Sequence, residues 1–82
     1  MGKEIYLTNH AKTKMDEREI SIEMIKQVVD NPDLTKPDKI DAKVLHLIKK
    51  IGNKFLRVLM RIDKDGKQII ITVFFDRRLK RS

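Results

Sequence analysis

Two groups of histidine and basic side chains in this 82-residue sequence have the types and spacing needed for chemistry on an anionic substrate. In the first group, His10, Lys14 and Arg18 recur every four residues, which places them in one stripe along a helix. One interpretation is that this stripe lines an anionic cleft. The other is a solvated face, balanced by the acidic residues between its members, and spacing alone favours that second interpretation.

The second group lies in the β-rich half of the chain, where His46, Arg57 and Arg61 alternate with apolar residues. Guanidinium groups on a central strand suit bidentate phosphate contact. A structural alternative is that the arginines pair with Asp76 and with N-terminal acids. His46 alone is more typical of a half-buried strand residue than of a catalyst, although histidine suits both roles.

Aromatic and further basic side chains accompany this second group. Phe55 and Phe74 could stack on nucleobases, or they could complete a second small core. Lys50 and the tail residues Arg77 and Arg78 add positive charge. We therefore predict a nucleic-acid-binding surface that comprises Lys14, His46, Lys50, Arg61, Phe74, Arg77 and Arg78.

Two turn signals define the register of the strands that carry these residues. Gly52-Asn53 and Asp65-Gly66 are interpreted as two-residue hairpin loops. This register places Val58, Met60 and Ile71 on an almost wholly apolar face that packs beneath the helices. The opposite, mixed face receives His46, Arg57, Arg61, Phe55, Phe74 and Asp76.

The remaining elements follow from periodicity and capping. Residues 4–7 suggest a short edge strand, Thr8 or Asn9 an N-cap, and 10–18 a helix. Ser21 caps a second helix that ends near Asn31-Pro32. Residues 31–42 are interpreted as a loop, with a short strand around Leu34 as an option. The prediction is one α+β domain over 1–82, with two N-terminal helices (about 8–31) packed on one face of a three- to four-stranded antiparallel sheet (about 43–76), and a basic tail at 77–82.

Composition narrows the function classes. The chain carries a net charge of +7, with 7 basic and 9 acidic residues over 1–41 but 12 basic and 3 acidic over 42–82. This asymmetry favours a polyanionic partner. The absence of cysteine excludes thiolate metal sites and thiol nucleophiles, and the two histidines lack metal-ligand spacing, so no metal or cofactor is expected. No apolar run is long enough for a membrane span, and we expect a cytoplasmic protein.

Several segments also resemble a known small domain family of unknown function. Residues 10–21 (HAKTKMDEREIS) resemble an H-A-x-x-R-M-x-x-R-x-I-s pattern, and 25–32 its v-x-x-v-l-x-n-P continuation. Leu56-Arg57-Val58 and the strand 71–74 resemble its l-R-V and i-T-V-y strands. That family is similar to the RelE/ParE toxin-like fold. Lys14 stands where the family usually has arginine, which keeps the charge but loses the planar fork.

The resemblance implies a metal-independent endoribonuclease that acts on free RNA or ribosome-bound mRNA, with an acidic antitoxin protein as a partner. In this interpretation His10 is the general acid or base, and Arg18 and Arg57 complete the catalytic set. RelE-like toxins often use a C-terminal Tyr or His, and here neither follows position 46. The alternative is a non-catalytic module of the same fold that binds nucleic acid or an acidic partner through its basic sheet face.

Overall fold

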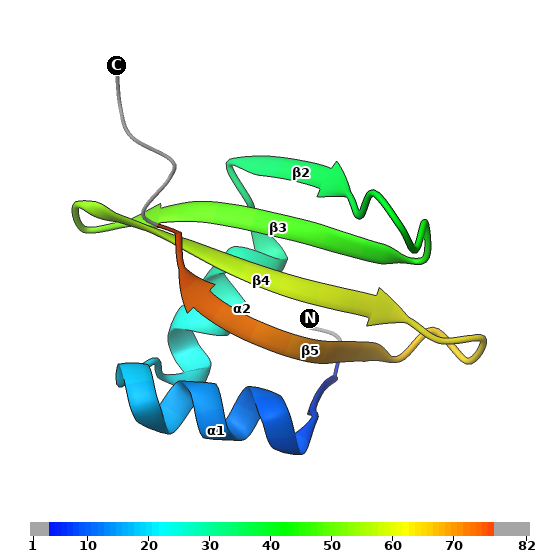
Figure 1. Ribbon diagram of the computed structural model, residues 1–82, viewed down its shortest axis with the longest axis horizontal. Helices are drawn as coiled ribbons and strands as arrows, with labels where there is room; N and C mark the ends of the chain where they lie inside the picture. The colour runs from blue at the N-terminus through cyan, green and yellow to red at the C-terminus, as the bar shows by residue number, and fades with distance from the viewer. Residues whose placement is uncertain (1–3, 77–82) are drawn as a thin grey trace.

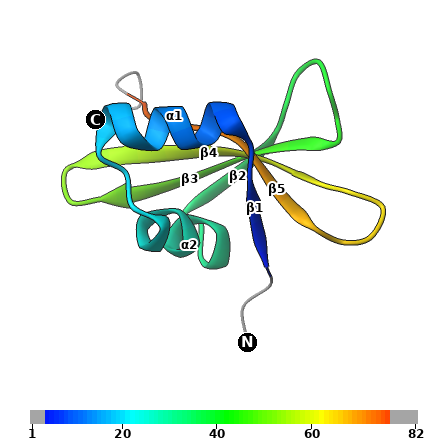
Figure 2. The same ribbon diagram turned by 90° about the horizontal axis from the view of Figure 1, so that it is seen from below.

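The computed structural model describes residues 4–76, and both helices lie on one side of a five-stranded sheet (Figures 1 and 2). The sheet order is β1-β5-β4-β3-β2. The elements, in chain order, are β1 (Ile5–Leu7), α1 (Asn9–Arg18), α2 (Ile22–Asp30), β2 (Leu34–Pro37), β3 (Val44–Ile51), β4 (Lys54–Ile62) and β5 (Gln68–Phe75). The predicted α+β class with two helices is confirmed.

The sheet differs from the prediction in strand number and direction. It has five strands rather than three or four, and it is mixed because β1 runs parallel to β5, with Ile5 opposite Gln68. This pairing joins segments far apart in the chain, so no local pattern reveals it. Strand β2 lies in the segment interpreted as a loop and pairs antiparallel with β3. Pro37 is tolerated there because β2 is an edge strand.

Both helices start at the predicted caps. The Thr8 hydroxyl accepts a hydrogen bond from the Ala11 backbone N–H (3.1 Å) and donates to the carbonyl of Ile71 (2.9 Å), so the start of α1 is attached to β5. The Ser21 hydroxyl accepts from the backbone N–H of Met24 (3.2 Å) at the start of α2. These bonds satisfy backbone donors that the first turn of a helix leaves unpaired.

The core lies between the helices and the inner face of the sheet. Buried apolar side chains from both layers meet there, and each of those larger than alanine contributes about 1.5–3 kcal/mol relative to exposure. They are Ala11, Ile20, Ile25, Val28, Leu47, Leu56, Val58, Met60, Ile70 and Val73.

The β3–β4 register is the predicted one. Ile51 lies opposite Lys54 across the Gly52-Asn53 loop, and His46 lies opposite Leu59. Leu47 and Val58 therefore face the core, and the alternate residues face away from the helices. We call this outer surface the helix-free face, and it comprises Lys36, His46, Ile48, Lys50, Phe55, Arg57, Leu59, Arg61, Thr72 and Phe74.

The β4–β5 register is the predicted one over only half its length. Asp63 and Lys67 close a three-residue loop, rather than the predicted two-residue one, with Gly66 at φ +87°. A bulge between Leu59 and Met60 compensates for this one-residue shift farther along. Ile70 is therefore buried in the core where Ile71 was predicted, and Ile71 is only half-buried.

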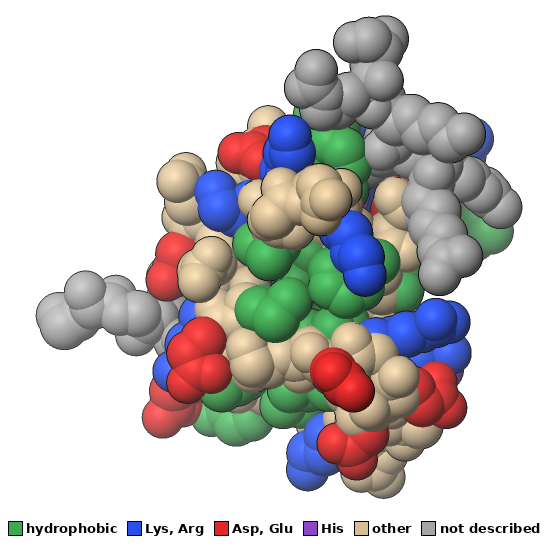
Figure 3. Space-filling view, turned by 90° about the vertical axis from the view of Figure 1, so that its left-hand side faces the viewer, with side chains coloured by type: hydrophobic (Ala, Val, Ile, Leu, Met, Phe, Trp, Pro, Cys, Tyr) green, Lys and Arg blue, Asp and Glu red, His purple; other side chains and the backbone are tan. Residues whose placement is uncertain are grey.

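One end of the molecule carries an apolar patch. Figure 3 shows hydrophobic side chains gathered there among lysine, arginine and acidic side chains. Met15, Ile51 and Phe75, from the ends of α1, β3 and β5, are half-buried hydrophobic residues packed against the core. Within residues 4–76, no helix is long and apolar enough to cross a membrane.

Candidate functional site

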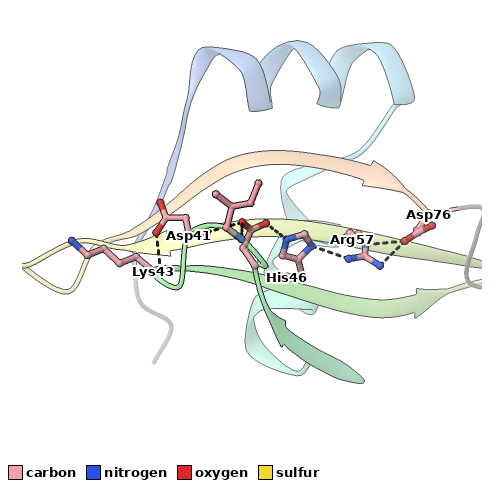
Figure 4. Close-up of polar contacts among 7 residues, drawn as sticks. Asp41, Lys43, His46, Arg57 and Asp76 are labelled. Atoms are coloured by element: carbon pink, nitrogen blue, oxygen red, sulfur yellow. Dashed lines mark hydrogen bonds and ion pairs between the residues drawn. The ribbon is translucent and has the colours of Figure 1, made fainter.

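Four polar side chains form a continuous hydrogen-bonded chain at the helix-free face. His46 Nε2 lies 2.7 Å from Asp38 Oδ1, and His46 Nδ1 lies 2.8 Å from Arg57 NH1. Arg57 in turn donates to Asp76. Figure 4 shows His46 and Arg57 side by side, with Asp76 beyond Arg57. The chain spans the sheet from the loop after β2 to the end of β5.

Asp38 is held by the loop that it closes. Its backbone N–H donates to the Val44 carbonyl (2.9 Å), and its Oδ2 accepts from the backbone N–H groups of Asp41 and Ile40, both at 3.0 Å. The bond from the Asp41 N–H, with those from His46 and the Ile40 N–H, lowers the pKa of Asp38 to about 2. The carboxylate therefore stays ionised near neutral pH and orients the imidazole.

Asp76 holds the other end of the chain. Both Nε (2.8 Å) and NH2 (2.7 Å) of Arg57 approach Asp76 Oδ2. The Asp76 backbone N–H donates to the carbonyl of Phe55 (2.8 Å), which fixes the residue beside β4. The side chain of Asp76 is only 8% exposed and that of Arg57 17%, so this ion pair is much less screened than a surface pair. The structural interpretation, in which Arg57 pairs with Asp76, is confirmed.

The contacts of His46 define its protonation state. A guanidinium group has only donors, so the nitrogen that faces Arg57 NH1 must present a lone pair. Nδ1 is therefore unprotonated, and Nε2 carries the proton and donates it to Asp38. The imidazole in this arrangement is neutral. His46 therefore adds no positive charge to the face in this arrangement, and Arg57 is directed at Asp76 and His46.

The attraction for an anion comes from the cations around this cluster. Lys36 lies opposite His46 on β2, Lys50 lies one residue before the end of β3, and Arg61 lies on β4 opposite Val44. All three are exposed, and none forms an ion pair with another residue in the part of the chain that the structure describes. Phe55, opposite Lys50, and Phe74, opposite Arg57, are half-buried.

A family model described as a domain of unknown function, DUF4258, matches residues 7–75. The chain belongs to this family. Searches of curated proteins and of solved structures found no match. The DUF4258 match runs from the end of β1 to the end of β5, so it includes Asp38, His46 and Arg57. The family description assigns no activity, and the RelE/ParE resemblance stays a prediction.

The predicted catalytic set of this DUF4258 domain does not come together. His10 and Arg18 lie on α1, on the helix side of the sheet, whereas the Arg57 side chain lies on the helix-free face. His10 is exposed, and its side chain forms no hydrogen bond or ion pair among residues 4–76. Lys14 pairs with Glu17 at 3.5 Å. Arg18 lies in the last turn of α1, where its positive charge interacts favourably with the negative end of the helix dipole. The solvated-face interpretation of the stripe therefore fits the structure better.

The predicted binding residues of the DUF4258 domain are partly brought together. His46, Lys50, Arg61 and Phe74 share the helix-free face, whereas Lys14 does not. Arg77 and Arg78 lie outside the described residues. Sequence reasoning missed Asp38, because the pairing of β2 with β3, which brings this loop residue beside His46, was not predicted. An aspartate directly after Pro37, with Asp41 three residues on, is typical of a side chain that closes a turn, and this signal could have found it.

Proposed function

We propose that this DUF4258 domain binds single-stranded RNA on its helix-free face. The observation that carries the proposal is the combination of exposed cations, which form no ion pair within residues 4–76, with aromatic side chains on that face. Lys36, Lys50 and Arg61 are spread over three neighbouring strands, so a flexible strand can reach all of them. Surfaces that bind single-stranded nucleic acid combine positive charge along the backbone with aromatic platforms for bases.

The aromatic side chains lie beside a small buried cluster on the same face. Ile48 and Val44 of this face are buried, whereas Phe55 and Phe74 are only half-buried and so remain candidates for stacking on a base. A stacked base contributes about 1–3 kcal/mol to binding, largely without regard to its identity. The proposed surface therefore binds RNA with little sequence preference.

The salt dependence of binding tests this proposal. Fluorescence anisotropy with a labelled single-stranded RNA, measured over a salt series, gives the slope of log affinity against log salt. Replacing both Lys50 and Arg61 by alanine should lower the slope by about 0.7 for each lost phosphate contact. The matched control replaces Lys12 of α1 and Lys26 of α2, which are exposed cations on the helix side.

The two double variants remove the same charge, so a non-specific loss of net charge affects both equally. If the Lys12 and Lys26 variant loses as much slope as the Lys50 and Arg61 variant, the helix-free face is not the binding surface. A wild-type protein that binds single-stranded DNA more tightly than RNA would remove RNA as its preferred ligand.

RNA cleavage is a second candidate function, which the contact between His46 and Arg57 favours. The side chain of the predicted base, His10, has no hydrogen-bond or ion-pair partner among residues 4–76, whereas His46 is oriented by Asp38 and lies 2.8 Å from a guanidinium group. Nδ1 of His46 becomes available as a base when Arg57 turns from it to the phosphate. In a metal-independent cleavage, a base takes the proton of the 2′-hydroxyl while a cation stabilises the phosphorane charge. The 2′-oxygen then bonds to phosphorus, the bond to the 5′-oxygen breaks, and that oxygen takes a proton from water.

Cleavage has its own test. With His46 as the base, products should carry 2′,3′-cyclic phosphate and form in the presence of EDTA. His46→Ala should then lower the rate about 10²–10⁴-fold, and His10→Ala should leave it unchanged. Intact RNA after incubation with wild-type protein, both free and on ribosomes, would exclude the nuclease and leave the binding proposal standing.

A further inference from the structure

We propose that His46 and Arg57 form a proton-gated phosphate site, in which protonation of His46 turns a closed contact into a pair of phosphate donors. This inference rests on the proposed function for the source of the phosphate, which is the RNA backbone. The gate itself rests on the geometry of the two side chains and on their charged neighbours.

In the closed state, Arg57 is engaged by its neighbours. Its Nε and NH2 approach Asp76 Oδ2, and its NH1 donates to Nδ1 of His46. Three of its nitrogens are therefore directed at these two partners, and the imidazole beside it is neutral. A phosphate that approaches this state finds no cationic His46 and an Arg57 turned toward Asp76 and His46, so Arg57 contributes less to binding.

Protonation of His46 changes both the geometry and the charge. The added proton can only go to Nδ1, because Nε2 already carries one. Two N–H donors would then face each other across 2.8 Å, and both groups would be cationic. The contact must open, because neither partner has a lone pair to offer.

The charged groups around His46 come from three directions. Asp38 lies at Nε2 and Arg57 at Nδ1, and Lys36 lies opposite on β2. Asp76 acts through Arg57. Asp38 keeps its bond to Nε2 when the ring is protonated, so the ring stays anchored at that side while Nδ1 is released.

The open state suits a phosphate oxygen. Nδ1–H of His46 and the released NH1 of Arg57 become two neighbouring donors, and protonation adds one positive charge at this point of the face. The His46 and Arg57 side chains are 18% and 17% exposed, so both reach the surface of the helix-free face. Charge-assisted bonds of this kind to phosphate are among the stronger hydrogen bonds in proteins.

The test compares RNA affinity at about pH 5.5 and about pH 7.5, on either side of the range in which histidine changes charge. The probe is an oligouridylate without terminal phosphates, so that the RNA has no titrating group, and ionic strength is held constant. Wild-type protein should bind at least about tenfold more tightly at the lower pH, which is the effect of the one charge-assisted hydrogen bond from Nδ1–H of His46, before any contribution from the released Arg57 NH1.

The two histidines of the chain provide a matched pair of variants. His46→Gln keeps an amide that can donate to Asp38 and accept from Arg57, but it cannot be protonated, so its affinity should not change with pH. His10→Gln should keep the wild-type pH dependence. Melting temperatures of both variants at each pH show that the comparison is made on folded protein.

A second arm separates the gate from the proposed function. Sulfate, whose charge does not change over this pH range, is titrated while NMR follows the Arg57 side-chain N–H and the His46 ring nitrogens of the wild-type protein. Sulfate should shift these signals at the lower pH only. If sulfate behaves this way but RNA does not bind, the gate stands and the RNA proposal fails.

The gate is overturned by any of three results. One is RNA binding that does not change with pH, and another is a pH dependence that survives His46→Gln. The third is a wild-type NMR spectrum that shows a proton on Nδ1 of His46 at neutral pH. In the first two cases RNA binding itself still stands.

Discussion

The bulge in β5 determines which isoleucine enters the core, and a pair of substitutions tests it. Ile70→Ala removes three carbons from a fully buried side chain, which costs about 2.4 kcal/mol at about 0.8 kcal/mol for each carbon. The cavity left behind raises the total, because buried Ile→Ala changes cost about 2–5 kcal/mol. Ile71 is only half-buried and leaves no closed cavity, so Ile71→Ala should cost about 1 kcal/mol.

Urea unfolding followed by circular dichroism measures both free energies. A domain of this size has about 5–15 kcal/mol of stability in total, so Ile70→Ala removes a large part of it. The milder pair Ile70→Val and Ile71→Val keeps the comparison measurable, with about 0.5–1.5 kcal/mol expected at the buried position. A melting temperature should fall by about 4–8 °C for each kcal/mol.

The two-residue hairpin predicted from the sequence, which has no bulge, places Ile71 in the core and Ile70 outside. It therefore predicts that the Ile71 variants lose more stability than the Ile70 variants. If the Ile71 variants are the less stable pair, the bulge is wrong. The residues of β5 near its start would then exchange faces, and the composition of the helix-free face around Arg61 would have to be revised.

Three further predictions concern single contacts. The pKa of Asp38, about 2 against an ordinary 3.8, means that its ionised form stabilises the fold above about pH 4 and that this contribution is lost toward pH 2. The urea midpoint should therefore fall less steeply between about pH 4 and about pH 2 in Asp38→Asn than in the wild-type protein. The same decrease in both proteins would contradict this. Thr8→Val removes the cap of α1 and its bond to β5, and should cost about 1–2 kcal/mol by urea unfolding, against a few tenths for Thr13→Val on the exposed helix surface. Glu19 ends α1 at φ 56°, so Glu19→Gly should raise the melting temperature by relieving about 1 kcal/mol of left-handed strain, and an unchanged or lower value would contradict this.

Local signals in the sequence predicted those parts of the fold that depend on neighbouring residues. Thr8 and Ser21 were predicted caps because their hydroxyls act within one helical turn. The Gly52-Asn53 loop fixed the β3–β4 register, and with it the proximity of His46 and Arg57. The pairing of Arg57 with Asp76 followed from the same alternation of faces.

The features that were missed depend on distant partners or on one-residue irregularities. Strand β1 pairs with β5, more than 60 residues later in the chain, and nothing in the three residues of β1 identifies that partner. Between β4 and β5, the longer loop shifts the pairing by one residue and the bulge shifts it back. The alternation of apolar and polar residues along the two strands therefore shows almost no sign of either change. The separation of the predicted catalytic set was missed for a similar reason, because the pattern of residues does not show that the sheet lies between His10 and the Arg57 side chain.

The position of β5 between β1 and β4 has a consequence for synthesis on the ribosome. Among the strands of residues 4–76 it is synthesised last, yet it supplies the fully buried Ile70 and Val73. Its Ile71 carbonyl also accepts a hydrogen bond from the hydroxyl of Thr8, 63 residues earlier in the chain. The helices and the β3–β4 hairpin therefore leave the exit tunnel before the strand that completes their apolar layer. Such long-range closure slows folding, and an incomplete sheet exposes apolar surface while it waits. Nascent chains stalled before residue 68 should accordingly be protease-sensitive and bind chaperones, and those released beyond residue 76 should not.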